Sequence, residues 1–211
     1  LVDLPKDVTN AETDSEPAPG RLPTYYEVPD RADEAGVEAA AGAVARAERP
    51  LVLAGGGVRK GEASAELRAF ANAYDLPVVT TMPGIGTFPE DHERCLSWAG
   101  MHGTGAANMA ISHTDCLVAV GTRFDDRLTG GVDSFAPEAE IVHVDIDAAE
   151  MSKNVHADYP LVGDAGDVLE QLHEALPEAY DEAGTAPDRY ADWCEQCTDW
   201  TEEYPMRYSA P

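Results

Sequence analysis

Lysine is scarce in this chain. Three lysines and eleven arginines face 40 acidic residues among 211, and the formal net charge is −26. A field of this sign repels phosphate backbones and anionic lipid surfaces, which argues against nucleic acid and against a membrane as partners. We expect most of the charge to lie on solvated helix faces and tails.

Long apolar runs and metal-binding patterns are also missing. No run of about 18 apolar residues and no signal peptide is visible, so we expect no membrane span and a cytoplasmic location. The six histidines show no metal-ligand spacing. Cys194 and Cys197 have the Cys-x-x-Cys spacing of redox and zinc sites, but no second pair accompanies them. We interpret them as part of a helix face and predict no metal site.

Strand and helix patterns alternate through the middle of the chain. This alternation predicts an α/β fold, a doubly wound and mostly parallel sheet with helices on both faces. Asp164 is placed to cap the last helix of this region. The expected strands cover 51–54, 77–81, 116–120, 141–144 and 161–162, and the expected helices cover 33–49, 62–74, 105–112 and 168–176, with a helical turn near Ala148.

Three regions are expected along the chain. Residues 1–34 would be the end of a preceding domain, beginning with an apolar strand-like run, followed by a linker. Residues 35–177 would be the central domain, because the alternating pattern fades at Pro177. Residues 178–211, with a helical pattern at 190–203, would connect to a C-terminal domain. The start at Leu1 instead of Met suggests a piece of a longer protein.

Polar clusters follow two successive predicted strands. Gly-Thr-Arg-Phe-Asp-Asp-Arg follows 116–120, and Asp-Ile-Asp ends the strand at 141–144. Ligands of open parallel sheets bind outside the carboxyl ends of the strands. These two loops therefore predict a nucleotide cleft.

Each polar residue of this cleft has a functional and a structural interpretation. Arg123 and Arg127 can clamp phosphate while Asp125 orients it, or the cluster can be a surface salt-bridge network. Adjacent Asp125 and Asp126 point oppositely on a strand, which disfavours a metal site. Asp145 suits a ribose hydroxyl, and Asp147 suits a helix cap.

Two glycine-rich loops are less specific. Gly55, Gly56 and Gly57 follow a strand, so their amides can face an anion, or they can form a tight turn without a ligand. His102 lies in the second such loop, where a lone histidine is more often structural than catalytic.

The motifs in residues 53–172 together resemble one family. AGGGV at 54–58, the loop 82–89, GMHGT at 100–104, GTRFDDRLTG at 121–130, HVDID at 143–147 and Lys153-Asn154 are similar to the central domain of the acetolactate (acetohydroxyacid) synthase catalytic subunit. The flanks, LVDLPKDV at the start and residues 200–208, resemble the neighbouring domains of this thiamine-diphosphate enzyme. Pro83 and Gly105 depart from the family pattern.

The resemblance implies an activity, cofactors and partners. The enzyme decarboxylates pyruvate and condenses it with a second 2-oxo acid in branched-chain amino-acid synthesis. Thiamine diphosphate, Mg²⁺ and the catalytic residues would lie in domains outside this chain, which is not expected to be active alone. The intact enzyme would be a homo-oligomer, with or without a regulatory subunit. The acidic, lysine-poor composition is similar to that of halophile proteins.

The central domain of that family binds FAD. The resemblance places the FAD contacts at Gly55, Gly56, Gly57, Thr81, Met82, Gly100, Met101, His102, Gly103, Gly121, Arg123, Asp125, Arg127, Asp145, Ile146 and Asp164. Two alternatives remain: a noncatalytic scaffold domain with a vestigial nucleotide site, or the central domain of a related enzyme such as glyoxylate carboligase, pyruvate oxidase or oxalyl-CoA decarboxylase.

Overall fold

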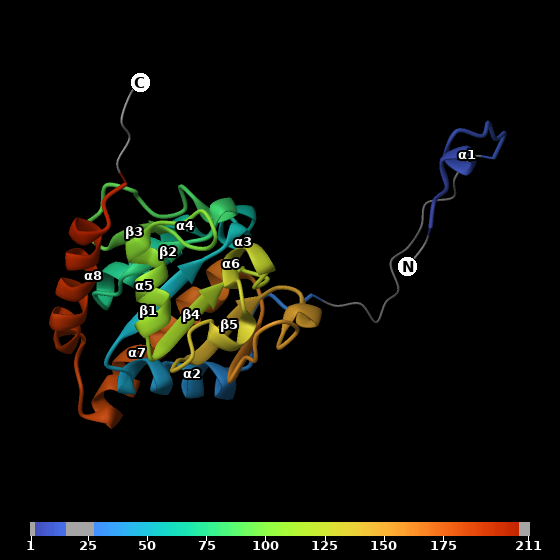
Figure 1. Cartoon of the computed structure of the whole chain (residues 1–211). Helices are drawn as coiled ribbons and strands as arrows, with labels where there is room; N and C mark the ends of the chain where they lie inside the picture. The colour runs from blue at the N-terminus through green and yellow to red at the C-terminus, as the bar shows by residue number, and fades with distance from the viewer. Residues whose placement is uncertain (1–2, 16–27, 207–211) are drawn as a thin grey trace, which may run out of the picture.

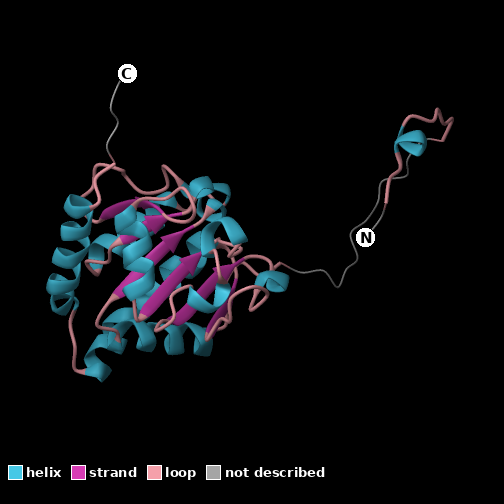
Figure 2. Ribbon diagram, viewed as in Figure 1, coloured by secondary structure: helices cyan, strands magenta, loops and turns pink. Residues whose placement is uncertain are grey.

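The computed structural model describes residues 3–15 and 28–206. Its centre is a six-stranded, all-parallel sheet with the strand order β3-β2-β1-β4-β5-β6 (Figure 2). The order reverses between β1 and β4, as in doubly wound folds. The predicted fold class is therefore confirmed. The strands are β1 Pro50–Ala54, β2 Val78–Thr80, β3 Cys95–Trp98, β4 Cys116–Val120, β5 Glu140–Asp145 and β6 Tyr159–Val162.

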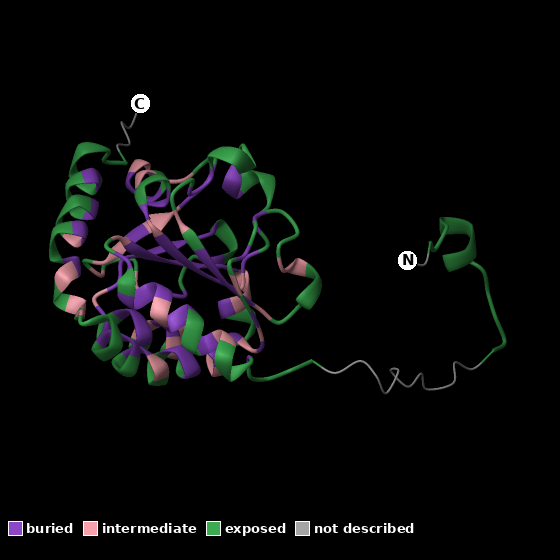
Figure 3. Cartoon of the chain, turned by 90° about the horizontal axis from the view of Figure 1, so that it is seen from below, coloured by how far each residue is buried: buried purple, intermediate pink, exposed green. Residues whose placement is uncertain are grey.

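The two central strands are apolar along their whole length. Every residue of β1 and β4 is buried, and the two strands pair in register from Pro50 with Cys116 to Ala54 with Val120. A parallel sheet that is covered on both faces requires such continuous apolar runs. Figure 3 shows the buried strands between helices whose outer sides are exposed.

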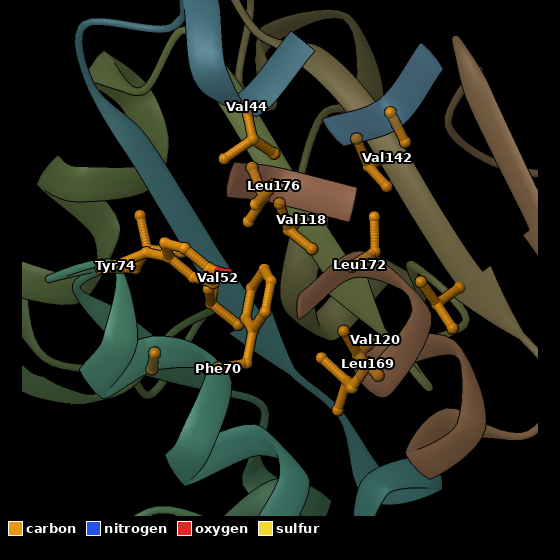
Figure 4. Close-up of a cluster of buried hydrophobic side chains, with 14 of the residues drawn as sticks. Val44, Val52, Phe70, Tyr74, Val118, Val120, Val142, Leu169, Leu172 and Leu176 are labelled. Carbon is orange, nitrogen blue, oxygen red and sulfur yellow. The ribbon is translucent and has the colours of Figure 1, made fainter. Parts of the chain in front are cut away.

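Helices α2 Glu34–Arg46, α4 Ser64–Ala73 and α7 Ala165–Ala183 cover one face of the sheet. Valines from the strands, such as Val52, Val118 and Val142, meet Phe70 and Leu172 from the helices (Figure 4). The alanines of α2 let this helix approach α7 closely, because they add little side-chain volume between the two axes.

Helices α5 Gly105–His113 and α8 Ala191–Glu203 cover the other face (Figure 1). Leu51 and Leu117 of the sheet belong to the same buried cluster as Trp193 and Trp200 of α8. Helix α8 also contacts β3 and α5. The helix near the end of the chain therefore forms part of the core.

Short helices complete the connections. They are α1 Lys6–Thr9, α3 Gly56–Lys60, α6 Asp126–Thr129 and the 3-10 helices η1 Met82–Gly84, η2 Val132–Ser134, η3 Ala148–Glu150 and η4 Pro187–Tyr190. The helical turn predicted near Ala148 is confirmed by η3.

Several local predictions were wrong. Strand β3 was not predicted, and the pattern does not end at Pro177, because α7 continues through this exposed residue to Ala183. Lys6–Thr9 is a helix without buried residues, not a strand. The predicted helix at 190–203 is an exception, because α8 at Ala191–Glu203 confirms it. Residues 1–2, 16–27 and 207–211 of the predicted flanking segments lie outside the described part, and the domain limits stay a prediction.

Candidate functional site

The predicted site residues all lie at one edge of the sheet, which we call the carboxyl edge. Each of them ends a strand or occupies the loop that follows it, because parallel strands all finish on the same side. They are Gly55–Gly57 after β1, Thr81 and Met82 after β2, Gly100–Gly103 after β3, Gly121, Arg123, Asp125 and Arg127 after β4, Asp145 and Ile146 at the end of β5, and Asp164 after β6.

The loops after β1 and β4 cross in direct backbone contact. Gly55 N donates to Val120 O at 2.8 Å, and Gly57 N donates to Gly121 O at 2.9 Å. A Cβ on Gly55 would overlap the carbonyl of Gly121, and a Cβ on Gly121 would lie 2.5 Å from the Cα of Gly57. Only glycines fit this crossing. Of the two interpretations of these glycines, the tight turn describes the amides of Gly55 and Gly57, because both donate to protein carbonyls.

Met82 and Pro83 form the start of η1, close to this crossing. A Cβ on Gly56 would lie 2.9 Å from the Cβ of Pro83. Thr81 N, just before η1, donates to Ala54 O at 2.9 Å. The proline that departs from the family pattern therefore packs on the β1 loop.

Backbone and amide hydrogen bonds also fix the loop after β3. Met101 N donates to Arg127 O at 2.9 Å, and the side chain of Asn108 exchanges hydrogen bonds with Gly100 N and O at 2.9 and 3.1 Å. The side chains of Met101 and His102 remain exposed. The structure thus leaves both of them free to meet a ligand or a neighbouring domain.

The departure at Gly105 has a packing explanation. A Cβ on this residue, the first of α5, would lie 2.5 Å from the Cβ of Tyr204, which follows α8. A larger residue at position 105 would displace the ring of Tyr204. The end of α8 therefore packs against the start of α5, directly after the GMHGT loop.

Residues 121–125, the β4 loop, carry the exposed side chain of Arg123. Thr122 O accepts from Nε2 of His143 at 2.8 Å, and Arg123 O accepts from Nδ2 of Asn154 at 2.9 Å. Asp125 caps α6 by accepting from Arg127 N at 3.1 Å. Among the described residues, neither Arg123 nor Arg127 forms an ion pair. This weakens the interpretation of the cluster as a surface salt-bridge network.

Sequence reasoning assigned no role to His143 or Asn154. His143 is fully buried on β5, and its Nδ1 has no hydrogen-bond partner within the described part of the chain. Burial lowers the pKa of the His143 imidazole, against smaller opposing effects of the Thr122 carbonyl and the charges of Asp145 and Glu150. A histidine inside an otherwise apolar strand was the available signal.

Carboxylates end β5 and follow β6. Asp145 Oδ1 accepts from Asp147 N at 2.9 Å, and Asp147 Oδ1 accepts from Ala149 N at 2.9 Å, so the predicted cap at Asp147 is confirmed. Asp164 caps α7 by accepting from Gly166 N at 2.8 Å, also as predicted. Asp145 is half-buried, and among the described residues only its Oδ1 accepts a hydrogen bond.

Apolar side chains are exposed along the same edge. Met82 is 58% exposed, Met101 62% and Ile146 50%, and they follow three different strands. Four surface hollows of the molecule are lined by residues of other faces. The carboxyl edge thus exposes two guanidinium groups that form no ion pair among the described residues, a carboxylate and apolar side chains, and we call this surface the ligand shelf.

The Cys-x-x-Cys pair lies on α8, as predicted. Cys197 is buried in the core, and Cys194 Sγ lies 3.3 Å from Asp75 O. Burial raises the pKa of both thiols, which disfavours the reactive thiolate. Among the described residues, no three His, Cys, Asp or Glu side chains gather as metal ligands would.

Comparison with known families agrees with this geometry. Residues 37–172 match the protein family described as "Thiamine pyrophosphate enzyme, central domain". The chain belongs to this family. The match begins in α2 and ends in α7, so it contains the whole sheet and every predicted site residue.

Similar relatives carry one enzyme name. A probable acetolactate synthase large subunit of Methanocaldococcus jannaschii is 48% identical over 83% of this chain and 30% of the relative. The acetolactate synthase large subunit of Corynebacterium glutamicum is 43% identical over 99% of this chain and 33% of the relative. Isozyme 2 of Escherichia coli is 38% identical over 100% of this chain and 36% of the relative. The chain thus spans about a third of the length of these relatives.

None of the helices in the described part of the chain is both long and apolar enough to cross a membrane.

Proposed function

We propose that this chain is the cofactor-binding middle domain of an acetolactate synthase large subunit, and that FAD lies along its carboxyl edge. The intact enzyme would decarboxylate pyruvate and join the product to a second 2-oxo acid. The names of the relatives support the activity. One structural observation carries the site: the ends of β2, β3, β4 and β5 bring Arg, Asp and apolar side chains to the ligand shelf.

The groups on this shelf fit the chemistry of FAD. A guanidinium can bind a diphosphate through two parallel hydrogen bonds, and Arg123 is exposed and free of ion pairs. Asp145 ends β5 with a carboxylate that can accept from ribose hydroxyls. Met82, Met101 and Ile146 offer exposed apolar surface for a flavin ring. The glycines of the β1–β4 crossing are explained by packing and give no separate support.

The residues of the chain would bind and orient the cofactor. Arg123 holds the diphosphate, Asp145 fixes the ribose, and the exposed methionines exclude water from one side of the ring. In the family that this chain resembles, bound FAD carries no net redox duty. Thiamine diphosphate and Mg²⁺ would be bound by other parts of the intact enzyme.

The names of the relatives also favour this enzyme over glyoxylate carboligase or pyruvate oxidase. Relatives from three organisms, an archaeon and two bacteria, are called acetolactate synthase. We further propose a cytoplasmic, salt-adapted homo-oligomer with a regulatory subunit. The net charge of −26 supports the salt adaptation, and the term "large subunit" in the relatives' names supports the second subunit.

The test is an FAD titration of the purified chain in molar KCl, followed by flavin fluorescence. Arg123→Ala should raise the dissociation constant about 10- to 100-fold, as expected for a lost charge-assisted hydrogen bond. Arg46→Ala is the matched control, because it removes the same charge from the exposed last turn of α2. Equal effects of the two variants would contradict the site. A folded chain that binds no FAD would favour the scaffold alternative.

A further inference from the structure

The backbone of the β4 loop has an unfavourable conformation. Gly121 has a φ of +61°, and Phe124 has a φ of +50° although it is not glycine. Side chains with a Cβ are rarely found in this left-handed region, because Cβ approaches the following carbonyl. Phe124 is also 2% exposed. Surrounding contacts must therefore hold the loop in this shape.

Three consecutive residues of the loop are each held from outside it. His143 Nε2 lies 2.8 Å from Thr122 O, and Asn154 Nδ2 lies 2.9 Å from Arg123 O. The ring of Phe124 packs edge-on against the imidazole of His143, with centroids 4.8 Å apart. It packs in the same way against Phe135 at 5.7 Å. Both hydrogen-bond donors come from β5 or from the segment just after it.

These contacts to the loop backbone determine the region that the guanidinium of Arg123 can reach. Its own side chain is exposed and makes no ion pair in the described part of the chain. The direction of the side chain therefore depends on the backbone on either side of it. That backbone is fixed by the carbonyls of Thr122 and Arg123.

We propose that His143 and Asn154 are positioning residues: they hold the β4 loop so that Arg123 faces the ligand shelf, and His143 does so as the neutral Nε2–H tautomer. The effect on a ligand rests on the proposed FAD site. The effect on the loop does not, because the loop geometry exists without a ligand.

The tautomer follows from the acceptor. A carbonyl oxygen can only accept, so Nε2 of His143 must carry the proton of this hydrogen bond. Nδ1 is then the bare nitrogen, and it is buried without a partner among the described residues. Asp145 and Glu150 are the charged groups that act on this imidazole, and one oxygen of Glu150 is likewise buried without a partner. Burial disfavours a second proton on the ring.

Three variants test the role of His143. His143→Leu removes the donor, His143→Gln retains an N–H at similar reach, and Arg123→Ala in the His143→Leu background measures the coupling. FAD titration in molar KCl should show a dissociation constant raised about fivefold or more for His143→Leu and within about twofold for His143→Gln. The penalty of Arg123→Ala should shrink in the His143→Leu background.

A second readout needs no flavin. Nitrogen-15 NMR of the flavin-free chain should show the Nε2–H tautomer of His143, and the amide resonances of residues 122–125 should move in His143→Leu and in Asn154→Ala. Asn154→Ala keeps the test valid if the His143→Leu chain does not fold. Asn154 is exposed, so its replacement should leave the fold intact. Asn72→Ala, on the exposed side of α4, is its matched control.

The outcomes separate this inference from the proposed function. If the loop resonances stay in place in both variants, or if a folded His143→Leu chain binds FAD like the unchanged chain and keeps the full Arg123→Ala penalty, the inference is overturned. If Arg123→Ala itself leaves FAD binding unchanged, the proposed function fails. The resonances of the flavin-free loop then still decide whether His143 and Asn154 position it.

Discussion

The amino edge of the sheet, where the strands begin, and the carboxyl edge differ in how the loops of the central strands β1 and β4 are joined. At the amino edge, side chains from distant parts of the sequence close the structure. Asp115 accepts from the amides of Glu48 and Arg49 at 2.9 and 2.8 Å, and Trp193 Nε1 donates to Pro50 O at 2.9 Å. At the carboxyl edge, the loops after β1 and β4 are joined by hydrogen bonds between backbone groups.

This difference decides which side chains are free. Polar side chains at the amino edge are used to close the fold. At the carboxyl edge, glycines let backbones satisfy one another, so Arg123, Met82 and Met101 project outward. Loops on a rigid scaffold commonly carry function for this reason. We therefore expect amino-edge variants to change stability, and most carboxyl-edge variants to change ligand binding.

The glycine crossing should be the exception, and its loss should have the largest effect. Gly121→Ala combines a left-handed φ with a clash against the backbone of Gly57, and should lower the free energy of unfolding by about 3 kcal/mol or more. Gly184→Ala is the matched control: its φ of +64° and ψ of +34° place it in the left-handed region, but nothing lies within 4 Å of the added Cβ. It should cost only about 1–2 kcal/mol in denaturant unfolding. Equal losses would show that the crossing adds no constraint.

A pair of tryptophans compares the two edges directly. Trp193 donates to Pro50 O at the amino edge, and Trp98 donates to His102 O at the carboxyl edge, both at 2.9 Å. Trp193→Phe leaves a buried carbonyl without its donor and should cost about 1–3 kcal/mol of stability with FAD affinity unchanged. Trp98→Phe should cost less stability, because its hydrogen bond is exposed, and should weaken FAD binding. The reverse pattern would break the comparison of the edges.

Some features of the sheet and of its carboxyl edge could be predicted from the sequence, and others could not. The strands at 116–120 and 141–144 were predicted because each is a short run of apolar residues, interrupted only by His143. Strand β3 was missed because only Leu96 of its residues is fully buried, so no such run exists. Arg123 and Asp145 of the carboxyl edge were predicted because parallel strands end together, whereas Met82 and Met101 were predicted only from the family resemblance. The crossing of Gly57 and Gly121 could not be predicted, since it depends on the register between β1 and β4.

A comparison of Asp164 with Asp33 distinguishes helix capping from ligand binding at the carboxyl edge. It caps α7 as Asp33 caps α2, with carboxylate-to-amide distances of 2.8 and 3.1 Å. Each change to alanine should cost about 1 kcal/mol of stability, because one helix amide loses its acceptor. If Asp164 also contacts FAD, only Asp164→Ala should raise the dissociation constant in the fluorescence titration. Identical affinities would leave Asp164 a cap and remove it from the predicted site.

The smallest expected effect is a pH dependence that arises from His143. Above about pH 6.5 the imidazole is neutral in the folded and in the unfolded chain and does not affect stability. As the pH falls, His143 of the unfolded chain binds a proton, whereas the buried imidazole of the folded chain stays neutral because its pKa is lowered. The free energy of unfolding therefore decreases until the pH falls below the lowered pKa of the folded chain. The charges of Asp145 and Glu150 reduce this loss. Denaturant unfolding between about pH 8 and pH 5, in constant molar KCl, should therefore show a steeper acid loss for the unchanged chain than for His143→Gln. Parallel curves would mean that the folded protein accepts the proton, and that Nδ1 has a partner which stabilises the imidazolium.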